Sequence, residues 1–141
     1  MSQNLERLKE AFACWDDRKG DSAAIDKWME LFGERCMFRT LGDGRAGIEF
    51  SKLAQTKEEV RGFFESLTSA LRMLHYTPHF FIEQGDRIAA LATTAWTNPA
   101  NGESAEFLIS TFWRFEGDKV VEFYQLYDTG EIQRVLASRA G

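Results

Sequence analysis

Two histidines near the middle of the chain are candidates for acid–base or metal chemistry, because histidine titrates near neutral pH and is a common metal ligand. His75 and His79 are four residues apart, which suits a metal ion only if both project from one helix. Pro78 disfavours a helix there, and no third ligand accompanies the pair, so we predict no metal site. His75 is expected to close a helix. His79 begins a predicted strand and is a candidate catalytic proton carrier.

A glycine-rich segment at residues 42–47, Gly-Asp-Gly-Arg-Ala-Gly, has the spacing of a dinucleotide-binding loop. Such a loop must open a helix within a βαβ unit. The next strong helix start is Thr56, and the chain then continues as hairpins. We therefore expect a loop at the mouth of a pocket and no cofactor.

Further candidates lie on a predicted strand near the C-terminus. Gln125 and Tyr127 share one face of this strand with Val121 and Phe123. Tyr127 could donate a hydrogen bond to a ligand, and Gln125 could orient a carbonyl group, although an amide cannot transfer a proton. Both are candidate catalytic or binding residues.

Three polar residues on other predicted strands complete the set. Thr40 and Thr111 are expected to line a pocket beside Gln125. Arg39 precedes Thr40 and is expected to face solvent; facing inward, it would favour an anionic or carbonyl-bearing ligand.

Three amphipathic helices are predicted to position these residues, because apolar side chains recur at three- and four-residue steps. Thr56 and Glu59 form a capping box that starts the third helix, and Pro78 limits its extent. The three apolar stripes are Leu5, Leu8, Phe12 and Trp15; Ile25, Trp28, Met29 and Phe32; and Val60, Phe63, Phe64, Leu67, Leu71 and Leu74.

A sheet is predicted from a short strand at 36–41 and a meander of strands at 79–83, 87–97, 103–115 and 119–127, separated by turns rich in Gly, Asn and Asp. A final helix follows with Ile132, Val135 and Leu136 on one side. Asp128 and Glu131 have the spacing of its N-cap, so we predict that Asp128 caps this helix rather than acting as an acid.

Both faces of the last two long strands carry apolar side chains. Phe107, Ile109, Thr111, Trp113 and Phe115 share one face, and Leu108 and Phe112 lie on the other, together with Val120, Tyr124 and Leu126 of the next strand. One face can pack on the helices and the other on a second copy of the chain. We therefore predict a homodimer that associates through the sheet.

Composition restricts the class of protein. The chain has 141 residues, enough for one domain with a sizeable core, and its net charge of −5 disfavours nucleic acid and anionic membranes as partners. No apolar run is long enough to span a bilayer, and no secretory signal is visible. Cys14 and Cys36 form no metal or redox motif, so we expect reduced thiols in a cytoplasmic protein.

The order of these elements resembles the nuclear transport factor 2-like superfamily, in its SnoaL-like and ketosteroid-isomerase-like branch. The resemblance covers nearly all of residues 1–141 and rests on the segments 19–21, 83–88, 113–123 and 127–129. It implies a single α+β domain with a cone-shaped, cystatin-like roll. Three N-terminal helices would pack on a strongly curved antiparallel sheet, with a short C-terminal helix, and the chain would commonly dimerise through its sheet.

The catalytic groups of the family do not carry over to this sequence. Alignment with the ketosteroid isomerases, a worked example of carboxylate chemistry, places Thr40 at the base, Thr111 at the oxyanion acid and Ala13 at the tyrosine. Gln125 matches the carboxylate of the SnoaL-type cyclases. The steroid-isomerase mechanism is therefore not expected.

The number of large rings favours a pocket, since the chain has more of them than a core this small needs. We expect it to bind a small, apolar, carbonyl-bearing molecule, with or without proton transfer of the isomerase or cyclase type. A non-catalytic dimeric interaction module is the alternative. The predicted pocket residues are Trp15, Phe38, Thr40, Phe64, Phe81, Trp96, Phe107, Ile109, Thr111, Trp113, Phe123, Gln125 and Tyr127.

Overall fold

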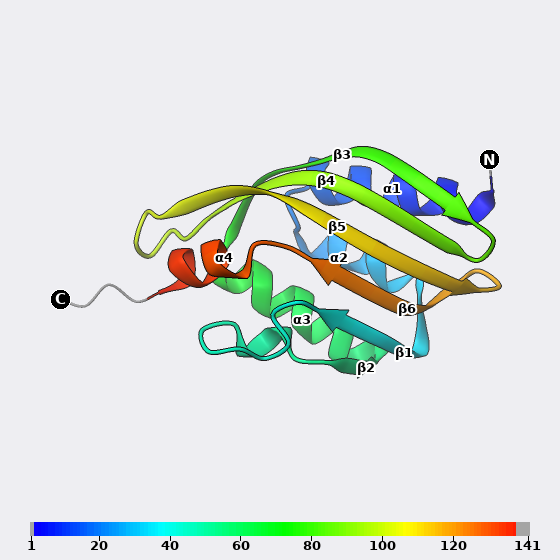
Figure 1. The fold of residues 1–141 in the computed structure, drawn as a ribbon, viewed down its shortest axis with the longest axis horizontal. Helices are drawn as coiled ribbons and strands as arrows, with labels where there is room; N and C mark the ends of the chain where they lie inside the picture. The colour runs from blue at the N-terminus through cyan, green and yellow to red at the C-terminus, as the bar shows by residue number, and fades with distance from the viewer. Residues whose placement is uncertain (1, 138–141) are drawn as a thin grey trace.

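A computed structural model describes residues 2–137 as an α+β domain in which one curved sheet is covered on one side by helices (Figure 1). The six strands are ordered β2-β1-β6-β5-β4-β3 in the sheet. In chain order the elements are α1 (Gln3–Asp17), α2 (Ser22–Met29), β1 (Phe32–Thr40), the 3-10 turn η1 (Glu49–Ser51), β2 (Ala54–Thr56), α3 (Lys57–Ala70), β3 (Arg72–Gln84), β4 (Arg87–Thr97), β5 (Ser104–Glu116), β6 (Lys119–Leu126) and α4 (Thr129–Leu136). No helix within residues 2–137 is long and apolar enough to cross a membrane.

Each long helix begins at a side-chain cap and buries the stripe predicted for it. The hydroxyl of Thr56 accepts a hydrogen bond from the Glu59 backbone N–H at 3.1 Å, which confirms the predicted start of α3. The buried stripes include Leu8, Phe12 and Trp15 of α1, Ile25 and Trp28 of α2, and Val60, Phe63 and Phe64 of α3. These helices therefore supply one wall of the core.

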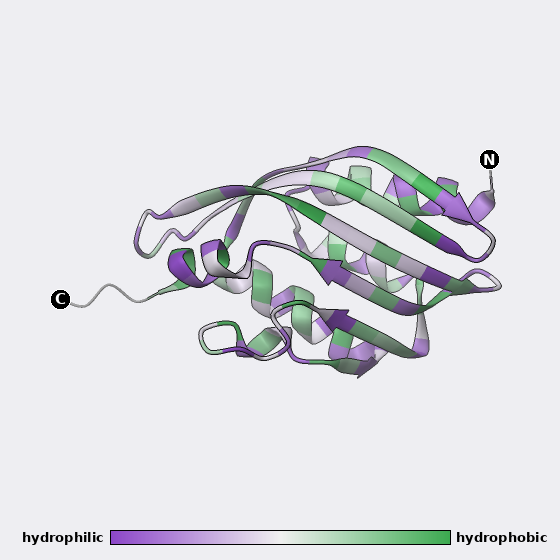
Figure 2. Cartoon of the chain, viewed as in Figure 1, coloured by the Kyte–Doolittle hydropathy of each residue, from purple (hydrophilic) through white to green (hydrophobic). Residues whose placement is uncertain are grey.

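Strands β3 to β6 form the predicted antiparallel meander, and hydrophobic residues recur along them (Figure 2). The predicted α+β fold class is confirmed, with one difference: the sheet is mixed rather than antiparallel throughout, because β1 pairs in parallel with β6. Strand β2, which was not predicted, pairs antiparallel with β1. The last strand, β6, reaches β1 only after the chain has passed through β3, β4 and β5. The alternation of apolar and polar residues within a strand does not predict such a distant partner.

The third helix ends earlier than predicted. It stops at Ala70, and Leu71 is already extended, with φ −130° and ψ 152°. Pairing with β4 begins at Arg72, and this long pairing overrides the helical stripe. Pro78 consequently lies inside β3, where it is tolerated because β3 is an edge strand.

A register shift between β5 and β6 changes one predicted face. Phe115 pairs with Val120 and Arg114 with Glu122, which leaves Val121 unpaired between them. Val120 is fully buried, although alternation placed it on the outer face.

The glycine-rich segment is an irregular loop, and the structure gives one of its glycines a steric role. A Cβ on Gly42 would lie 2.5 Å from the Tyr127 hydroxyl and 2.6 Å from the Ser51 hydroxyl. Only glycine allows the loop to approach Tyr127 this closely. The loop leads to the short turn η1 rather than to a long helix.

Candidate functional site

A cavity of about 60 Å³ lies between the inner face of β5 and β6 and the three long helices. Aromatic rings make up most of its wall. It is lined by Phe12, Trp15, Trp28, Phe63, Phe64, Leu67, Tyr76, Trp96, Phe107, Ile109, Thr111, Trp113, Phe123, Gln125, Tyr127 and Ile132. Among the residues that the structure describes, none that lines this cavity is an acid, a lysine, an arginine or a histidine.

The cavity runs along β5 from Trp113 to Phe107, with Ile109 and Thr111 between them on the same face. Six residues of strand span about 20 Å. Trp113 is buried, whereas Phe107 is partly exposed and packs near Tyr127 with ring centroids 6.3 Å apart. We call the Trp113 side the closed end and the Phe107 side the mouth.

Stacked rings form the closed end. The indole of Trp28 lies against that of Trp113, with centroids 5.2 Å apart and planes at 14°. Trp113 Nε1 donates to the Thr111 hydroxyl at 2.9 Å. Trp28 Nε1 is also buried, but it has no hydrogen-bond partner among residues 2–137.

Two neutral polar groups lie midway along the cavity. Gln125 of β6 pairs with Thr111 of β5 on one side and with Thr40 of β1 on the other. Three of the four positions that the family resemblance singled out are thus neighbours across three strands, whereas Ala13 is exposed on α1. Only Thr111 and Gln125 line the cavity, because the Thr40 hydroxyl turns toward the loop and donates to the Ser51 carbonyl at 3.1 Å.

At the mouth, the hydroxyl of Tyr127 is used by the protein itself. It forms hydrogen bonds with the side chains of Thr40 and Ser51. Both of those hydroxyls also donate to backbone carbonyls, Thr40 to Ser51 and Ser51 to Ile48. Burial raises the pKa of Tyr127 above its ordinary value, and burial likewise raises the pKa of Tyr76. Both phenols are therefore neutral over the physiological range.

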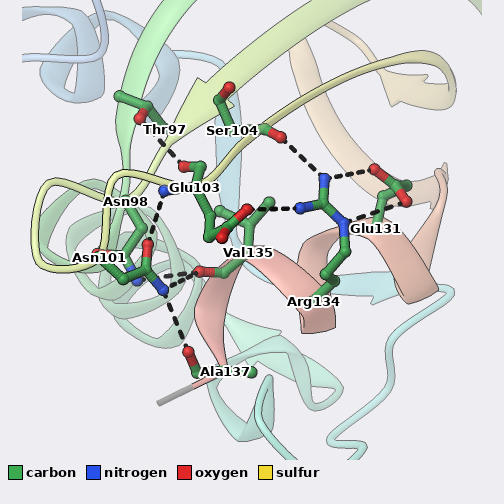
Figure 3. Close-up of polar contacts among 9 residues, drawn as sticks. All are labelled: Thr97, Asn98, Asn101, Glu103, Ser104, Glu131, Arg134, Val135 and Ala137. Carbon is green, nitrogen blue, oxygen red and sulfur yellow. Dashed lines mark hydrogen bonds and ion pairs between the residues drawn. The ribbon is translucent and has the colours of Figure 1, made fainter. Parts of the chain in front are cut away.

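Helix α4 covers the mouth with Ile132 and is tied to the β4–β5 hairpin (Figure 3). Asp128 caps this helix by accepting from the Glu131 backbone N–H at 3.0 Å, as predicted. Asn98 and Asn101 donate to the Val135 carbonyl, each at 3.0 Å. Arg134 donates to Glu103 at 2.9 Å and to the Ser104 carbonyl at 2.8 Å. These bonds fix α4 over the opening.

Most of the predicted pocket residues are brought together in this cavity. Ten line it: Trp15, Phe64, Trp96, Phe107, Ile109, Thr111, Trp113, Phe123, Gln125 and Tyr127. Phe38 does not, because it lies one strand further on and stacks flat on Phe123 with centroids 4.3 Å apart. Phe81 does not line it either; its ring packs against that of the lining residue Phe12, with centroids 5.6 Å apart.

The two histidines lie away from the cavity. His79 Nε2 is 2.5 Å from the Thr93 hydroxyl on the outer face of the sheet, which does not suit the predicted proton carrier. His75 does not close a helix; it lies in β3 and pairs with Glu106 at 2.7 Å. Arg39 faces outward, as expected, and pairs with Asp43 at 3.4 Å. No group of acids, cysteines and histidines within residues 2–137 could hold a metal ion.

Six lining residues were missing from the predicted set: Phe12, Trp28, Phe63, Leu67, Tyr76 and Ile132. Five of them belonged to predicted apolar helix faces. Such a pattern predicts that a side chain points into the core, but not whether it lines a cavity there. Tyr76 had no such indication, since it was expected between a helix and a strand.

Comparisons with known proteins agree with this architecture. A family model described as the SnoaL-like domain matches residues 8–123. A nuclear transport factor 2-like protein of unknown function from Burkholderia pseudomallei is 25% identical, with a TM-score of 0.84 over 98% of this chain and 100% of that one. No match is found among curated proteins.

Two more distant structures share the fold. A candidate SnoaL-like polyketide cyclase from a Jannaschia species is 13% identical, with a TM-score of 0.77 over 98% of this chain and 94% of that one. A protein with a ketosteroid-isomerase-like fold from Catenulispora acidiphila, in complex with trimethylamine, is 12% identical. Its TM-score is 0.71, over 89% of this chain and 91% of that one. Together with the matched domain model, the cone-like α+β fold shows that the chain belongs to the SnoaL-like domain family of the nuclear transport factor 2-like superfamily.

Proposed function

We propose that this protein binds a small, neutral, mainly apolar molecule with a carbonyl-type acceptor in the cavity between the sheet and the helices. The observation that carries the proposal is the composition of the wall: aromatic rings, with Thr111 and Gln125 as neutral polar groups midway along it. Apolar walls with a few placed polar groups are typical of small-molecule sites. A structural neighbour forms a complex with trimethylamine, which supports the small size of the ligand but not its charge.

The lining favours a neutral ligand. An ion moved from water into an apolar cavity loses its hydration, and this cost is large unless an opposite charge compensates it. The described lining residues offer no such charge. A ligand with a carboxylate or an ammonium group inside the cavity is therefore disfavoured.

Binding is better supported than proton transfer. A general base works best with a pKa near the operating pH. The titratable groups in the described lining are Tyr76 and Tyr127, and burial raises the pKa of both away from neutrality. Gln125 can orient a carbonyl group but cannot accept its α-proton.

The size of the cavity implies movement at its mouth. A volume of about 60 Å³ is well below the roughly 150 Å³ of an engineered protein cavity that binds benzene. Leu67, Phe107, Gln125 and Tyr127 are partly exposed, unlike the buried rings of the closed end. Side-chain rotation on binding is common, so we infer that these four residues move apart as the ligand enters.

Thermal unfolding with matched probes tests the proposal. Acetophenone, a neutral aryl ketone, should raise the unfolding temperature of the protein, because a ligand that binds only the native state stabilises it. Benzoate, of similar size but anionic, should not. Equal stabilisation by both probes, or by neither, would overturn the proposal.

The outer face of the sheet supports a second function, association with another copy of the chain. Met37, Phe80, Ile82, Leu108, Phe112 and Leu126 are each at least 40% exposed on this face, across four strands, and we call them the outer apolar face. Exposed apolar patches of this kind mark interaction surfaces. A sheet face with apolar side chains on several strands suits a self-complementary, two-fold contact, so we propose a homodimer.

A further inference from the structure

Tyr76 lines the cavity from β3, although β3 is two strands away from β5 in the sheet. The inner face of the intervening strand β4 carries small buried residues, Ala92 and Thr94, and Thr94 is the register partner of Tyr76. The tyrosine ring therefore extends over β4 toward β5. It stacks on the ring of Phe12, another lining residue, with centroids 5.5 Å apart and planes at 29°.

The hydroxyl of Tyr76 makes no hydrogen bond with the described part of the chain. Its backbone N–H is paired, with the Asp16 carboxylate at 2.8 Å. Burial raises the pKa of Tyr76 and no hydrogen bond acts on it, whereas the pKa of Tyr127 also responds to bonds with Thr40 and Ser51. Buried hydroxyls in folded proteins are nearly always paired, so an unpaired one calls for an explanation. Packing alone does not supply it, because phenylalanine would fill the same space without a polar atom.

The Tyr76 hydroxyl can be reached from the cavity, unlike the N–H of Trp28. Trp28 Nε1 is the side-chain nitrogen or oxygen within residues 2–137 that has less than 1 Å² of accessible surface and no hydrogen-bond partner. The Tyr76 hydroxyl also lacks a partner there but is not enclosed in this way, so it retains accessible surface. Tyr76 as a whole is 5% exposed and lines the cavity. Its hydroxyl thus borders space that a ligand atom can enter.

Gln125 offers a second unpaired polar group from the other side of β5, since it lies on β6. Its backbone carbonyl accepts from the Leu41 N–H at 2.8 Å, but its side-chain amide forms no hydrogen bond with the described residues. The hydroxyls of Thr111 and Tyr127, in contrast, are already bonded to other side chains. Two uncommitted polar groups therefore lie on opposite sides of β5, with aromatic wall between them.

We propose that the Tyr76 hydroxyl donates a hydrogen bond to a second acceptor of the ligand, a role that rests on the proposed small-molecule function. Gln125 binds one acceptor from β6, and Tyr76 binds the other from β3. The apolar part of the ligand lies against the rings between them. The ligand class is thereby narrowed to neutral, mainly apolar compounds that carry two acceptors, and Tyr76 is a specificity-determining residue of the site.

Acetophenone and two ring-nitrogen analogues test this assignment. In 3-acetylpyridine and 4-acetylpyridine a nitrogen with a lone pair replaces one C–H group of the ring, so the shape is kept and a second acceptor is added. At about pH 8, where this nitrogen is neutral, at least one analogue should bind the wild type about 3-fold or more tightly than acetophenone in titration calorimetry. Equal or weaker binding of both analogues would overturn the role of Tyr76, and this comparison needs no variant.

Tyr76→Phe removes the hydroxyl and keeps the ring. In this variant the preference for the acetylpyridine should disappear, so that the ratio of dissociation constants falls to one or below. Tyr124→Phe is the matched control, because it removes a hydroxyl that bonds to Glu122 outside the cavity, and it should keep the wild-type ratio. A wild-type ratio in Tyr76→Phe would overturn the assignment while the cavity still binds acetophenone. Failure of all three probes to bind the wild type would overturn the proposed function as well.

The stability of the free protein separates a binding role from a role in folding. Because the Tyr76 hydroxyl has no partner in residues 2–137, Tyr76→Phe should unfold at the wild-type temperature or above it. Groups that serve binding often contribute nothing to stability. A lower unfolding temperature, or a variant that does not fold, would show that the hydroxyl supports the fold and would contradict the proposal.

Discussion

The stacked indoles of Trp28 and Trp113 differ in one respect: the N–H of Trp113 donates to Thr111 at 2.9 Å, and the N–H of Trp28 has no partner in the described chain. One donor is satisfied by the fold, and the other is enclosed by aromatic rings. The Trp113–Thr111 bond therefore fixes one polar group of the cavity wall, whereas Trp28 contributes aromatic surface.

Thr111→Val should destabilise the protein by leaving the Trp113 N–H unpaired. Valine has nearly the shape of threonine but accepts no hydrogen bond, and Thr111 is only 2% exposed. The free energy of unfolding, measured in urea, should fall by about 1–3 kcal/mol. Thr77→Val, at an exposed position of β3, should change it by less than about 0.5 kcal/mol. Equal effects would mean that the bond contributes little.

Gln125→Ala should weaken the binding of acetophenone by roughly 2- to 12-fold, the value of one net hydrogen bond. Tyr127→Phe should leave the affinity nearly unchanged, because its hydroxyl is used by Thr40 and Ser51. Titration calorimetry of the two variants separates these roles. Gln84→Ala, at an exposed strand end, is the control. A large loss in Tyr127→Phe with none in Gln125→Ala would reverse the two assignments.

Arg134→Ala should loosen the helix that covers the mouth. The substitution removes the bonds to Glu103 and the Ser104 carbonyl, so that residues 129–136 open more often. Hydrogen exchange of their amides should accelerate by about 3- to 10-fold, as expected for charge-assisted bonds that are partly exposed. Arg18→Ala, which removes a comparable surface pair with Asp21, should leave α4 unchanged. Protection of α4 equal to that of the wild type would show that other contacts hold it.

Stability should decrease in alkaline solution through Tyr76. Burial raises its pKa above the ordinary value of about 10, so the folded state keeps a proton that the unfolded chain releases. Stabilisation by the neutral phenol is complete below pH 10 and is lost as the pH rises further, by up to about 1.4 kcal/mol per pH unit. Urea unfolding at pH 9, 10 and 11 measures this slope. Tyr76→Phe should reduce it, and an identical slope would contradict the burial argument.

Leu108→Glu should convert the proposed dimer to a monomer. Leu108 is 60% exposed on the outer apolar face, and a charge buried in a dimer contact is costly. Light scattering at micromolar concentration should give twice the chain mass for the wild type and the chain mass for the variant. Leu53→Glu, in the segment before β2, should remain dimeric. A monomeric wild type would refute the proposed association.

Local patterns predicted the helices, the meander and most of the cavity wall. Thr56 with Glu59 and Asp128 with Glu131 marked two helix starts correctly, because a cap depends on residues that are neighbours in sequence. Alternation along β5 placed Phe107, Ile109, Thr111 and Trp113 on the inner face.

The failures came from long-range pairing. Pairing with β4 decides whether Leu71 to His75 continue the helix or start β3. The path of the whole meander decides that β6 returns parallel to β1. The same holds for the site. Trp28 was assigned to an apolar helix face, but the lack of a partner for its N–H depends on every ring packed around it.

A crystal structure of the acetophenone complex tests the central claim most directly. The account predicts density for the probe between Trp28 and Tyr127, with its oxygen within hydrogen-bond distance of Gln125 or Thr111 and the side chains at the mouth moved outward. Density for the probe only on the outer apolar face, with the cavity unchanged, would contradict it.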